Sequence, residues 1–258
     1  MDLGIAGRHA VICASSAGLG HGCALHLARA GCSIVLNGRD EEKLEQAAAV
    51  LRKEAGAEVT AILGDITERK TREKLLSVKP VDILVNNAGG PPLADFRDLS
   101  DEDIHRGLNS NMVTPIMMVQ GVIDGMVERG FGRIVNITSA SVLTGIPKLD
   151  LSSGARAGLT AFLSGVARQV AGSNVTINNL LPGNFDTDRQ DAIIANIAKQ
   201  AGKAEDEVRK ARESSGPAGR FGTPDEFGAA CAFLASTHAG YITGQNLLMD
   251  GGAFTANF

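Results

Sequence analysis

Aromatic residues are scarce in this chain, which has one tyrosine, Tyr241, and no tryptophan. Tyr241 lies close to the C-terminus, so the middle of the sequence contains no phenol. A phenol titrates at about pH 10 and becomes a usable acid when a neighbouring cation stabilises its anion. Acid–base chemistry that depends on a tyrosine in the centre of the chain is therefore excluded.

A strong charge of one sign and long apolar runs are also missing. The net charge of −4 provides no basic field that would attract nucleic acid or an anionic membrane surface. The first residues contain no apolar core of signal-peptide length, and no later run is long enough to span a bilayer. We therefore expect a cytoplasmic protein with no nucleic-acid or membrane partner.

Cysteine is rare, and its four positions share no spacing typical of metal ligands: Cys13, Cys23, Cys32 and Cys231. Three of them fall in segments with the pattern of buried strands or helices. This distribution indicates reduced structural thiols rather than a disulfide framework, and no metal site is expected.

Glycine is abundant, with 31 residues in a chain of 258, which indicates many tight turns and close backbone approaches. Short apolar runs alternate with segments whose apolar residues recur at helical spacing. The predicted strands cover residues 10–13, 33–36, 58–63, 81–85, 133–138, 175–181 and 245–249. The predicted helices cover residues 18–30, 40–55, 68–78, 100–109, 112–129 and 153–171.

This alternation predicts an α/β fold, a doubly wound parallel sheet of the Rossmann type with helices on both faces. No linker, repeat or low-complexity segment divides the chain, so residues 1–258 are expected to form a single domain. A polar helical stretch at about 184–220 interrupts the alternation after the sixth strand. We interpret it as a lid over the carboxyl ends of the strands, the alternative being a solvated helical excursion.

The turn after the first strand predicts a dinucleotide site. Such a site needs glycine for a tight turn, for close approach of the pyrophosphate and for packing of helix on strand. The phosphates would rest on the free N–H groups at the start of the following helix. Ala14 stands where a first glycine is usual, which is a departure from the pattern. The residues of this turn expected to bind the cofactor are Ala14, Ser16, Ala17, Gly18, Leu19 and Gly20.

The end of the second strand indicates the type of dinucleotide. An acidic side chain there would accept hydrogen bonds from a ribose 2′-hydroxyl, whereas an arginine suits a 2′-phosphate. The sequence has Asn37-Gly38-Arg39, followed by Asp40, which suits the N-cap of the next helix. NADP(H) is therefore favoured over NAD(H), and the alternative is that Arg39 is a plain surface charge.

Further motifs resemble the short-chain dehydrogenase/reductase family over almost the whole chain, in particular its 3-oxoacyl-carrier-protein reductases. Asn86-Asn87-Ala88-Gly89 matches a signature of that family, and residues 220–226, 241–245 and 250–252 resemble its C-terminal signatures. The resemblance implies NADP(H) binding. It adds to the cofactor site Asp65 and Ile66 near the adenine, Asn87, Ala88 and Gly89 under the cofactor, and Pro182, Gly183 and Thr187 at the nicotinamide amide.

The resemblance also implies hydride transfer between the nicotinamide and a carbonyl/alcohol pair, carried out with an asparagine, a serine, a tyrosine and a lysine. Asn111 and Ser139 match the first two, but Ser152 and Arg156 stand where the tyrosine and lysine are expected. A serine hydroxyl is a far weaker acid than a phenol, and an arginine keeps its proton and has a planar fork. Ser139 and Arg156 could still polarise a carbonyl, and Arg156 could also hold the nicotinamide ribose.

Three alternatives follow for the chemistry, of which we favour an oxidoreductase with an unusual proton donor. That proton would come from water, from an acidic group of the substrate, or from Lys148, Asp150, Asp186 or Asp188. The second alternative is a hydride transfer that needs little acid help. The third is a catalytically silent NADP(H)-binding or regulatory protein.

Each catalytic candidate also has a plain structural interpretation. Ser139 could be a strand-end serine satisfied by the backbone, and Asn111 could cap a helix. For Ser152 we favour an ordinary N-cap of a helix that begins at Ser153 over any catalytic role.

By analogy with the family, the helices over 112–129 and 153–171 are expected to pair across a subunit interface in a homotetramer or homodimer. Small residues of the second helix would permit this close packing: Ala155, Ala157, Gly158, Ala161 and Gly165. The expected substrate is a small carbonyl or alcohol, which the sequence does not identify further.

Overall fold

The computed structural model describes residues 1–91 and 93–256, and its centre is one parallel sheet of seven strands. The strands are β1 (His9–Ile12), β2 (Ser33–Gly38), β3 (Val59–Leu63), β4 (Ile83–Asn86), β5 (Gly132–Ile137), β6 (Val175–Pro182) and β7 (Asn246–Met249). Their order in the sheet is β3-β2-β1-β4-β5-β6-β7. The order reverses between β1 and β4, which opens a crevice at the carboxyl ends of these two strands. The prediction of a doubly wound Rossmann-type sheet is therefore confirmed.

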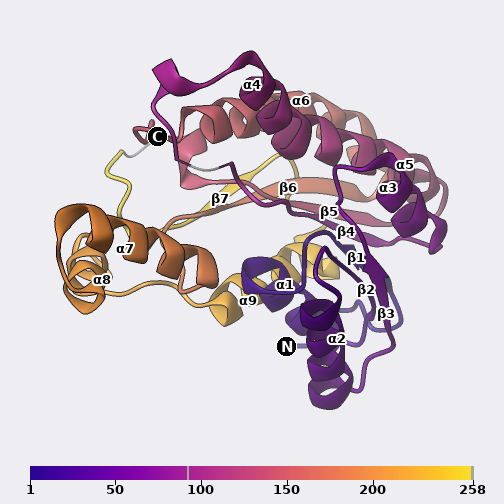
Figure 1. Ribbon diagram of the computed structural model, residues 1–258. Helices are drawn as coiled ribbons and strands as arrows, with labels where there is room; N and C mark the ends of the chain where they lie inside the picture. Colours follow the sequence, from indigo (N-terminus) through magenta and orange to yellow (C-terminus); the bar gives the residue numbers. More distant parts are fainter. Residues whose placement is uncertain (92, 257–258) are drawn as a thin grey trace.

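Helices cover both faces of this sheet (Figure 1). One face carries α1 (Gly18–Arg29), α2 (Glu41–Ala55) and α9 (Pro224–Ala235), and the other carries α3 (Arg69–Ser77), α5 (Thr114–Glu128) and α6 (Asp150–Val170). The short helix α4 (Asp101–Leu108) packs against α6. Successive side chains of a strand point to opposite faces, so Ile12 lies in one core and Val11 in the other. A strand buried on both faces has to be apolar throughout, as the sequence pattern indicated.

Local capping explains where several helices begin and end. The Asp40 carboxylate accepts a hydrogen bond from the backbone N–H of Lys43 and caps α2, which ends at Gly56 in the left-handed conformation. Thr223 and Glu226 form a capping box at the start of α9, with Pro224 in the first turn. These side chains satisfy N–H groups that have no partner within the helix, and a glycine at the end avoids the steric cost of a positive φ. The predicted roles of Asp40 and Gly56 are confirmed.

The structure corrects two predicted helix boundaries. The helix predicted from Ser153 begins at Asp150, so Ser152 lies inside α6 and is not an N-cap. The helices predicted over 100–109 and 112–129 are joined by a π-helical turn, Asn109–Val113, rather than separated. Asn111 lies in this turn and therefore does not cap a helix. Both errors have one cause, because serine and asparagine favour caps only when the tertiary contacts place a helix end beside them.

The stretch predicted as a lid is helical. It contains α7 (Asp188–Ala201) and α8 (Glu205–Ser214), which lie beside the main body of the molecule in Figure 1. A small apolar cluster holds them together, formed by Ile194, Ala198, Val208 and Phe221. Arg209 of α8 adds ion pairs to Asp186 and Asp191. The two helices thus have their own core and charge network, as expected of a segment that packs as a unit.

The four cysteines are buried free thiols, and burial raises the pKa of Cys13 to about 12. Such thiols are unreactive and act as small apolar side chains. No helix among residues 1–91 and 93–256 has the length and hydropathy needed to cross a membrane. On α6, Ala155 is buried inside the chain and is not available to an interface, whereas Ala161 and Gly165 are exposed.

Helices α1 and α9 approach each other so closely that only glycine fits at their contact. A Cβ atom added to Gly228 would lie 2.2 Å from the carbonyl oxygen of Gly22. We expect Gly228→Ala to reduce the free energy of unfolding by about 1–3 kcal/mol, because two backbones must move apart. Urea unfolding measures the difference. Gly165→Ala is the control, because a Cβ there meets nothing and alanine favours the helix; equal stability of the two variants would contradict the prediction.

Candidate functional site

The glycine-rich turn between β1 and α1 forms one wall of the crevice. Ala14 has a φ of 45° and Gly18 a φ of 59°, both in the left-handed region. Ala14, which stands where a glycine is usual, therefore adopts a conformation that glycine prefers. For alanine this conformation costs about 1–2 kcal/mol relative to an ordinary one. No side chain caps the start of α1, so its first N–H groups stay free for a ligand.

Gly20 is enclosed by the turn and by the segment after β4. A Cβ at this position would lie 2.7 Å from the Ala14 carbonyl oxygen and 2.8 Å from Asn87 Nδ2. Asn87 Nδ2 itself donates a hydrogen bond of 2.9 Å to the Ala14 carbonyl. This bond joins the Asn86–Gly89 segment to the turn, so that two motifs far apart in the sequence form one surface. Ala88 is half-buried beside this surface, and a Cβ on Gly89 would meet no atom.

Polar groups gather at the carboxyl ends of β2 and β3. Arg39 Nη1 lies 3.5 Å from Asp65 Oδ2, and a Cβ on Gly38 would lie 3.0 Å from Ser16 Oγ. Partial burial of the Asp65 carboxyl opposes ionisation, but hydrogen bonds from Thr67 and the charge of Arg39 outweigh it and lower the pKa. Ile66 is buried in the core, so its side chain faces away from this edge. Arg39 and Asp65 thus lie together at this edge, and Ser16 lies beside Gly38, the residue before Arg39.

The segment after β6 closes the opposite side of the crevice. Pro182 ends β6, and Gly183 passes so close to Asp250 that a Cβ would lie 2.7 Å from the Asp250 Cβ. The Thr187 hydroxyl caps α7 by accepting from the backbone N–H of Gln190. Thr187 also faces the start of α1, since a Cβ on Gly18 would lie 3.7 Å from Thr187 Cγ2. Of the predicted residues 182, 183 and 187, Thr187 therefore lies against the glycine-rich turn, and Pro182 and Gly183 lie at the end of β6 beside Asp250.

The four residues proposed for the chemistry come from three neighbouring elements. Ser139 follows β5, Asn111 lies in the π turn, and Ser152 and Arg156 lie on α6, which packs against both. Ser139 Oγ accepts a hydrogen bond from the backbone N–H of Ser141, as in its plain structural interpretation. Asn111 Oδ1 is buried and has no hydrogen-bond partner among residues 1–91 and 93–256. A buried amide oxygen without a partner is unusual and is suited to accept from a water molecule or a ligand.

Ser152 and Arg156 form a buried pair one helical turn apart. Arg156 Nε donates to Ser152 Oγ at 3.1 Å, and Arg156 Nη1 donates to the Ile137 carbonyl at 2.7 Å. The Ile137 bond directs the guanidinium to the end of β5, where Ser139 follows. Arg156 is 8% exposed. Burial, and then the positive charge of Arg189, lower its pKa to about 10, so it remains a cation at neutral pH.

The comparisons agree with this geometry. A family model described as enoyl-(acyl carrier protein) reductase matches residues 13–254. The acetoacetyl-CoA reductase of Allochromatium vinosum is 34% identical, over 96% of this chain and 98% of that protein. The chain belongs to the short-chain dehydrogenase/reductase family.

Two further short-chain dehydrogenase/reductase proteins are similar to the chain along its whole length. The 3-oxoacyl-[acyl-carrier-protein] reductase of Aquifex aeolicus is 30% identical, over 98% of this chain and 100% of that protein. The structure of L-sorbose reductase from Gluconobacter frateurii, complexed with NADPH and L-sorbose, superimposes with a TM-score of 0.94 at 27% identity and covers 99% of this chain and 100% of that one.

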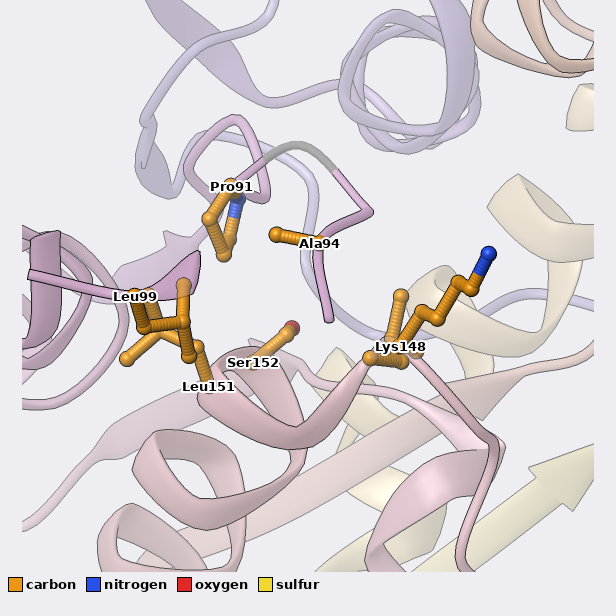
Figure 2. Close-up of a pocket in the computed structure, with 7 residues that line it drawn as sticks. Pro91, Ala94, Leu99, Lys148, Leu151 and Ser152 are labelled. Atoms are coloured by element: carbon orange, nitrogen blue, oxygen red, sulfur yellow. The ribbon is translucent and has the colours of Figure 1, made fainter. Parts of the chain in front are cut away.

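The other predicted proton sources in this short-chain dehydrogenase/reductase chain are not equally placed. Lys148 lines the same pocket as Ser152, but its ammonium group extends away from the Ser152 hydroxyl (Figure 2). Lys148 also has a φ of 66°, which is strained for lysine. Asp186 pairs with Arg209, and Asp150 and Asp188 are exposed at the first turns of their helices. None of these four side chains forms a hydrogen bond with Ser152 or Arg156 among the described residues.

Sequence reasoning named Lys148 but missed the other residues that surround Ser152. The pocket beside Ser152 is lined by Pro91, Ala94, Leu99, Lys148, Leu149 and Leu151. It also missed Arg189, which donates hydrogen bonds from α7 to the carbonyls of Gly90 and Pro91 at 3.1 and 3.3 Å. The sequence contains no signal for these residues, because they come from three segments joined only by tertiary contacts. One indication of Arg189 was its position, because it follows the predicted cofactor residue Thr187 by two residues.

Proposed function

We propose that the chain is an NADP(H)-dependent oxidoreductase that interconverts a carbonyl and an alcohol by hydride transfer. Ser152 and Arg156 take the place of the family's tyrosine and lysine, so the proton donor is atypical. The whole chain would act as one cofactor-binding domain. The observation that carries this proposal is the buried Ser152–Arg156 pair, directed to the end of β5 beside Ser139.

The crevice fits a dinucleotide phosphate. The uncapped start of α1 would bind the pyrophosphate, and Gly18, whose Cβ would meet only Thr187 at 3.7 Å or more, leaves room for its close approach. Arg39 and Ser16 would hold the 2′-phosphate, with Asp65 near the adenine. Thr187 and its neighbours would hold the nicotinamide amide. When bound, the cofactor supplies the hydride, and the L-sorbose reductase complex with NADPH supports this assignment by similarity.

The residues of the chain would polarise the carbonyl and exclude water. Ser139 and Arg156 donate hydrogen bonds toward the oxygen on which negative charge develops, which is the largest contribution that a fixed site makes. Asn111, whose Oδ1 has no partner in the described part of the chain, would hold a water molecule that relays the proton. Ser152 orients the guanidinium of Arg156 and does not itself act as the acid, since an alcohol is too weak an acid at neutral pH.

The loss of NADPH absorbance over ketones, aldehydes, diketones, short oxo acids and oxoacyl thioesters tests the proposed activity. We expect oxidation of NADPH with at least one of these carbonyl classes. A catalytically silent NADP(H)-binding protein is the second candidate, because the only tyrosine, Tyr241, is fully exposed, and no phenol lines the site. Tight NADPH binding without turnover over the whole panel would favour this candidate and contradict the first.

The preference for NADP(H) is expected to depend on Arg39. In Arg39→Gln the Kd for NADPH should rise by about ten- to a hundredfold while the Kd for NADH changes little, because only NADPH carries the 2′-phosphate. Fluorescence titration measures both constants. Arg52→Gln on α2 is the control, since it removes the same charge away from the crevice. An equal rise in the Kd for NADPH and in the Kd for NADH would show that Arg39 does not bind the 2′-phosphate.

A further inference from the structure

Two arginines beside the Ser152 pocket have no acidic partner. Arg156 bonds only to a hydroxyl and a carbonyl, and Arg189 bonds only to two carbonyls, within residues 1–91 and 93–256. Neither forms an ion pair there, and the strongest charge acting on Arg156 is the like charge of Arg189. Two guanidinium groups close enough to influence each other repel when no carboxylate lies between them, so an anion that binds both would relieve this repulsion.

A chain of contacts places both cations around one pocket. Arg189 donates to the Pro91 carbonyl, Pro91 and Ser152 line the same pocket, and Ser152 accepts from Arg156. Figure 2 shows Pro91 and Ser152 facing this space from opposite segments. Arg156 is more than nine-tenths buried and Arg189 is exposed, and each is joined to the pocket by a hydrogen bond to a lining residue, Ser152 for Arg156 and Pro91 for Arg189. Arg156 Nη2 makes no hydrogen bond to a described residue, which leaves one donor of the fork free.

The acidic residues nearby do not neutralise these charges. Asp186 and Asp191 form ion pairs with Arg209 instead. Asp188 makes no ion pair with a described residue. The residues that line the pocket include no acid and one further cation, Lys148. Asp150, two residues before Ser152, is also exposed and makes no ion pair with a described residue, so three cations, Lys148, Arg156 and Arg189, stand against two carboxylates around Ser152, although the chain as a whole is acidic. Such a local excess attracts and orients an anion.

We propose that the substrate carries a carboxylate close to its reacting carbonyl carbon and that Arg189, together with Arg156, binds this carboxylate. The inference rests on the proposed oxidoreductase and defines its substrate class as short oxo acids and hydroxy acids. A guanidinium fork matches a carboxylate in geometry as well as in charge, which makes the pair selective against amides and esters. Arg189 is a specificity-determining residue in this proposal.

The phosphates of the cofactor are the other source of negative charge. The start of α1 already provides free N–H groups for the pyrophosphate, on the side of the crevice where Gly18 faces Thr187. The Arg189 guanidinium instead reaches beyond Gly89 to Gly90 and Pro91, and Pro91 lines the Ser152 pocket. This position favours the substrate carboxylate, and the experiment separates the two sources.

The test measures the binding of malonate and of malonamide to the NADP⁺-saturated protein by calorimetry. These two probes have the same skeleton and differ in charge. We expect malonate to bind at least about tenfold more tightly, as for a hydrogen bond to a charged group. Arg189→Gln should abolish this preference, Arg189→Lys should retain part of it, and both should leave the Kd for NADP⁺ unchanged. Arg69→Gln on α3 is the control, because it removes one positive charge from a distant exposed site.

Two results would overturn the inference. Malonate could bind no better than malonamide, or neither probe could bind. Alternatively, Arg189→Gln could weaken NADP⁺ while leaving the preference for malonate intact, which would assign Arg189 to the cofactor. Because the readout is binding and not turnover, a protein that never oxidises NADPH would still give a clear answer. Failure of the proposed activity and failure of this inference are thus distinguishable.

Discussion

The double variant Ser152→Tyr, Arg156→Lys is expected to reduce neutral ketones with a kcat about 10²–10⁴-fold above that of the native chain. A positioned general acid contributes a factor of this size, and a phenol beside an ammonium is a far stronger acid than a serine hydroxyl. The two positions are one helical turn apart on α6, and their side chains are already in contact. The pocket beside Ser152 has no room for a water molecule in the structure, so its lining residues must shift to admit the ring.

The measurement is the initial rate of NADPH oxidation, with the melting temperature recorded for each variant. The matched control is Ser152→Phe, Arg156→Lys, which adds the same ring without a hydroxyl and should show no gain. If the phenylalanine and tyrosine variants are equally active, the gain comes from packing and Ser152 does not occupy the position of an acid. A gain that is confined to the tyrosine variant supports an intact pocket whose acid has been replaced.

The variant Arg156→Met is expected to reduce kcat/KM by about 10²–10³-fold for any carbonyl that the native chain turns over. Arg156 is the cation aimed at the end of β5, and removing one donor from an oxyanion site has an effect of this size. The melting temperature of this variant should not fall along with its activity. Arg156 is a buried cation without an ion pair among the described residues, so an apolar side chain of similar length should leave the melting temperature unchanged or raise it.

Kinetics, NADPH titration and thermal unfolding together test this prediction. Arg168→Met is the control on the same helix, because Arg168 is exposed and its loss should change neither activity nor stability. A large decrease in the melting temperature of Arg156→Met would contradict the prediction, since it would assign Arg156 a mainly structural role. A variant that stays folded and binds NADPH, but no longer turns over, would place Arg156 in the chemistry.

The fold and the cofactor crevice were largely predictable from the sequence because their signals are local. The order of strands and helices follows from apolar periodicity, and Asp40 and Gly56 mark the ends of α2 through capping chemistry. The glycine-rich turn and the Asn86–Gly89 segment are short motifs whose glycines are required by the backbone itself. The structure joins them through the Asn87–Ala14 hydrogen bond, which no local pattern contains.

The environment of Ser152 was not predictable in the same way. Serine is a good N-cap, so local propensity favoured a helix start next to it, whereas packing against the turns after β5 and α4 extends α6 back to Asp150. Lys148, just before that helix begins, has a positive φ, which costs conformational energy. Which side chains face Ser152 depends on segments that are about 60 residues away in the chain and on the approach of α7.

The sequence by itself determined the parallel sheet, the dinucleotide turn and the absence of a central phenol, because each depends on residue type and spacing along one segment. Only the tertiary structure decided that Ser152 supports Arg156 rather than capping a helix, and that Arg189 bonds to a residue that lines the same pocket. These facts depend on the charge and burial of groups brought together from β5, α6 and α7. Burial and the electrostatic field are properties of the folded assembly of segments, and no single stretch of sequence encodes them.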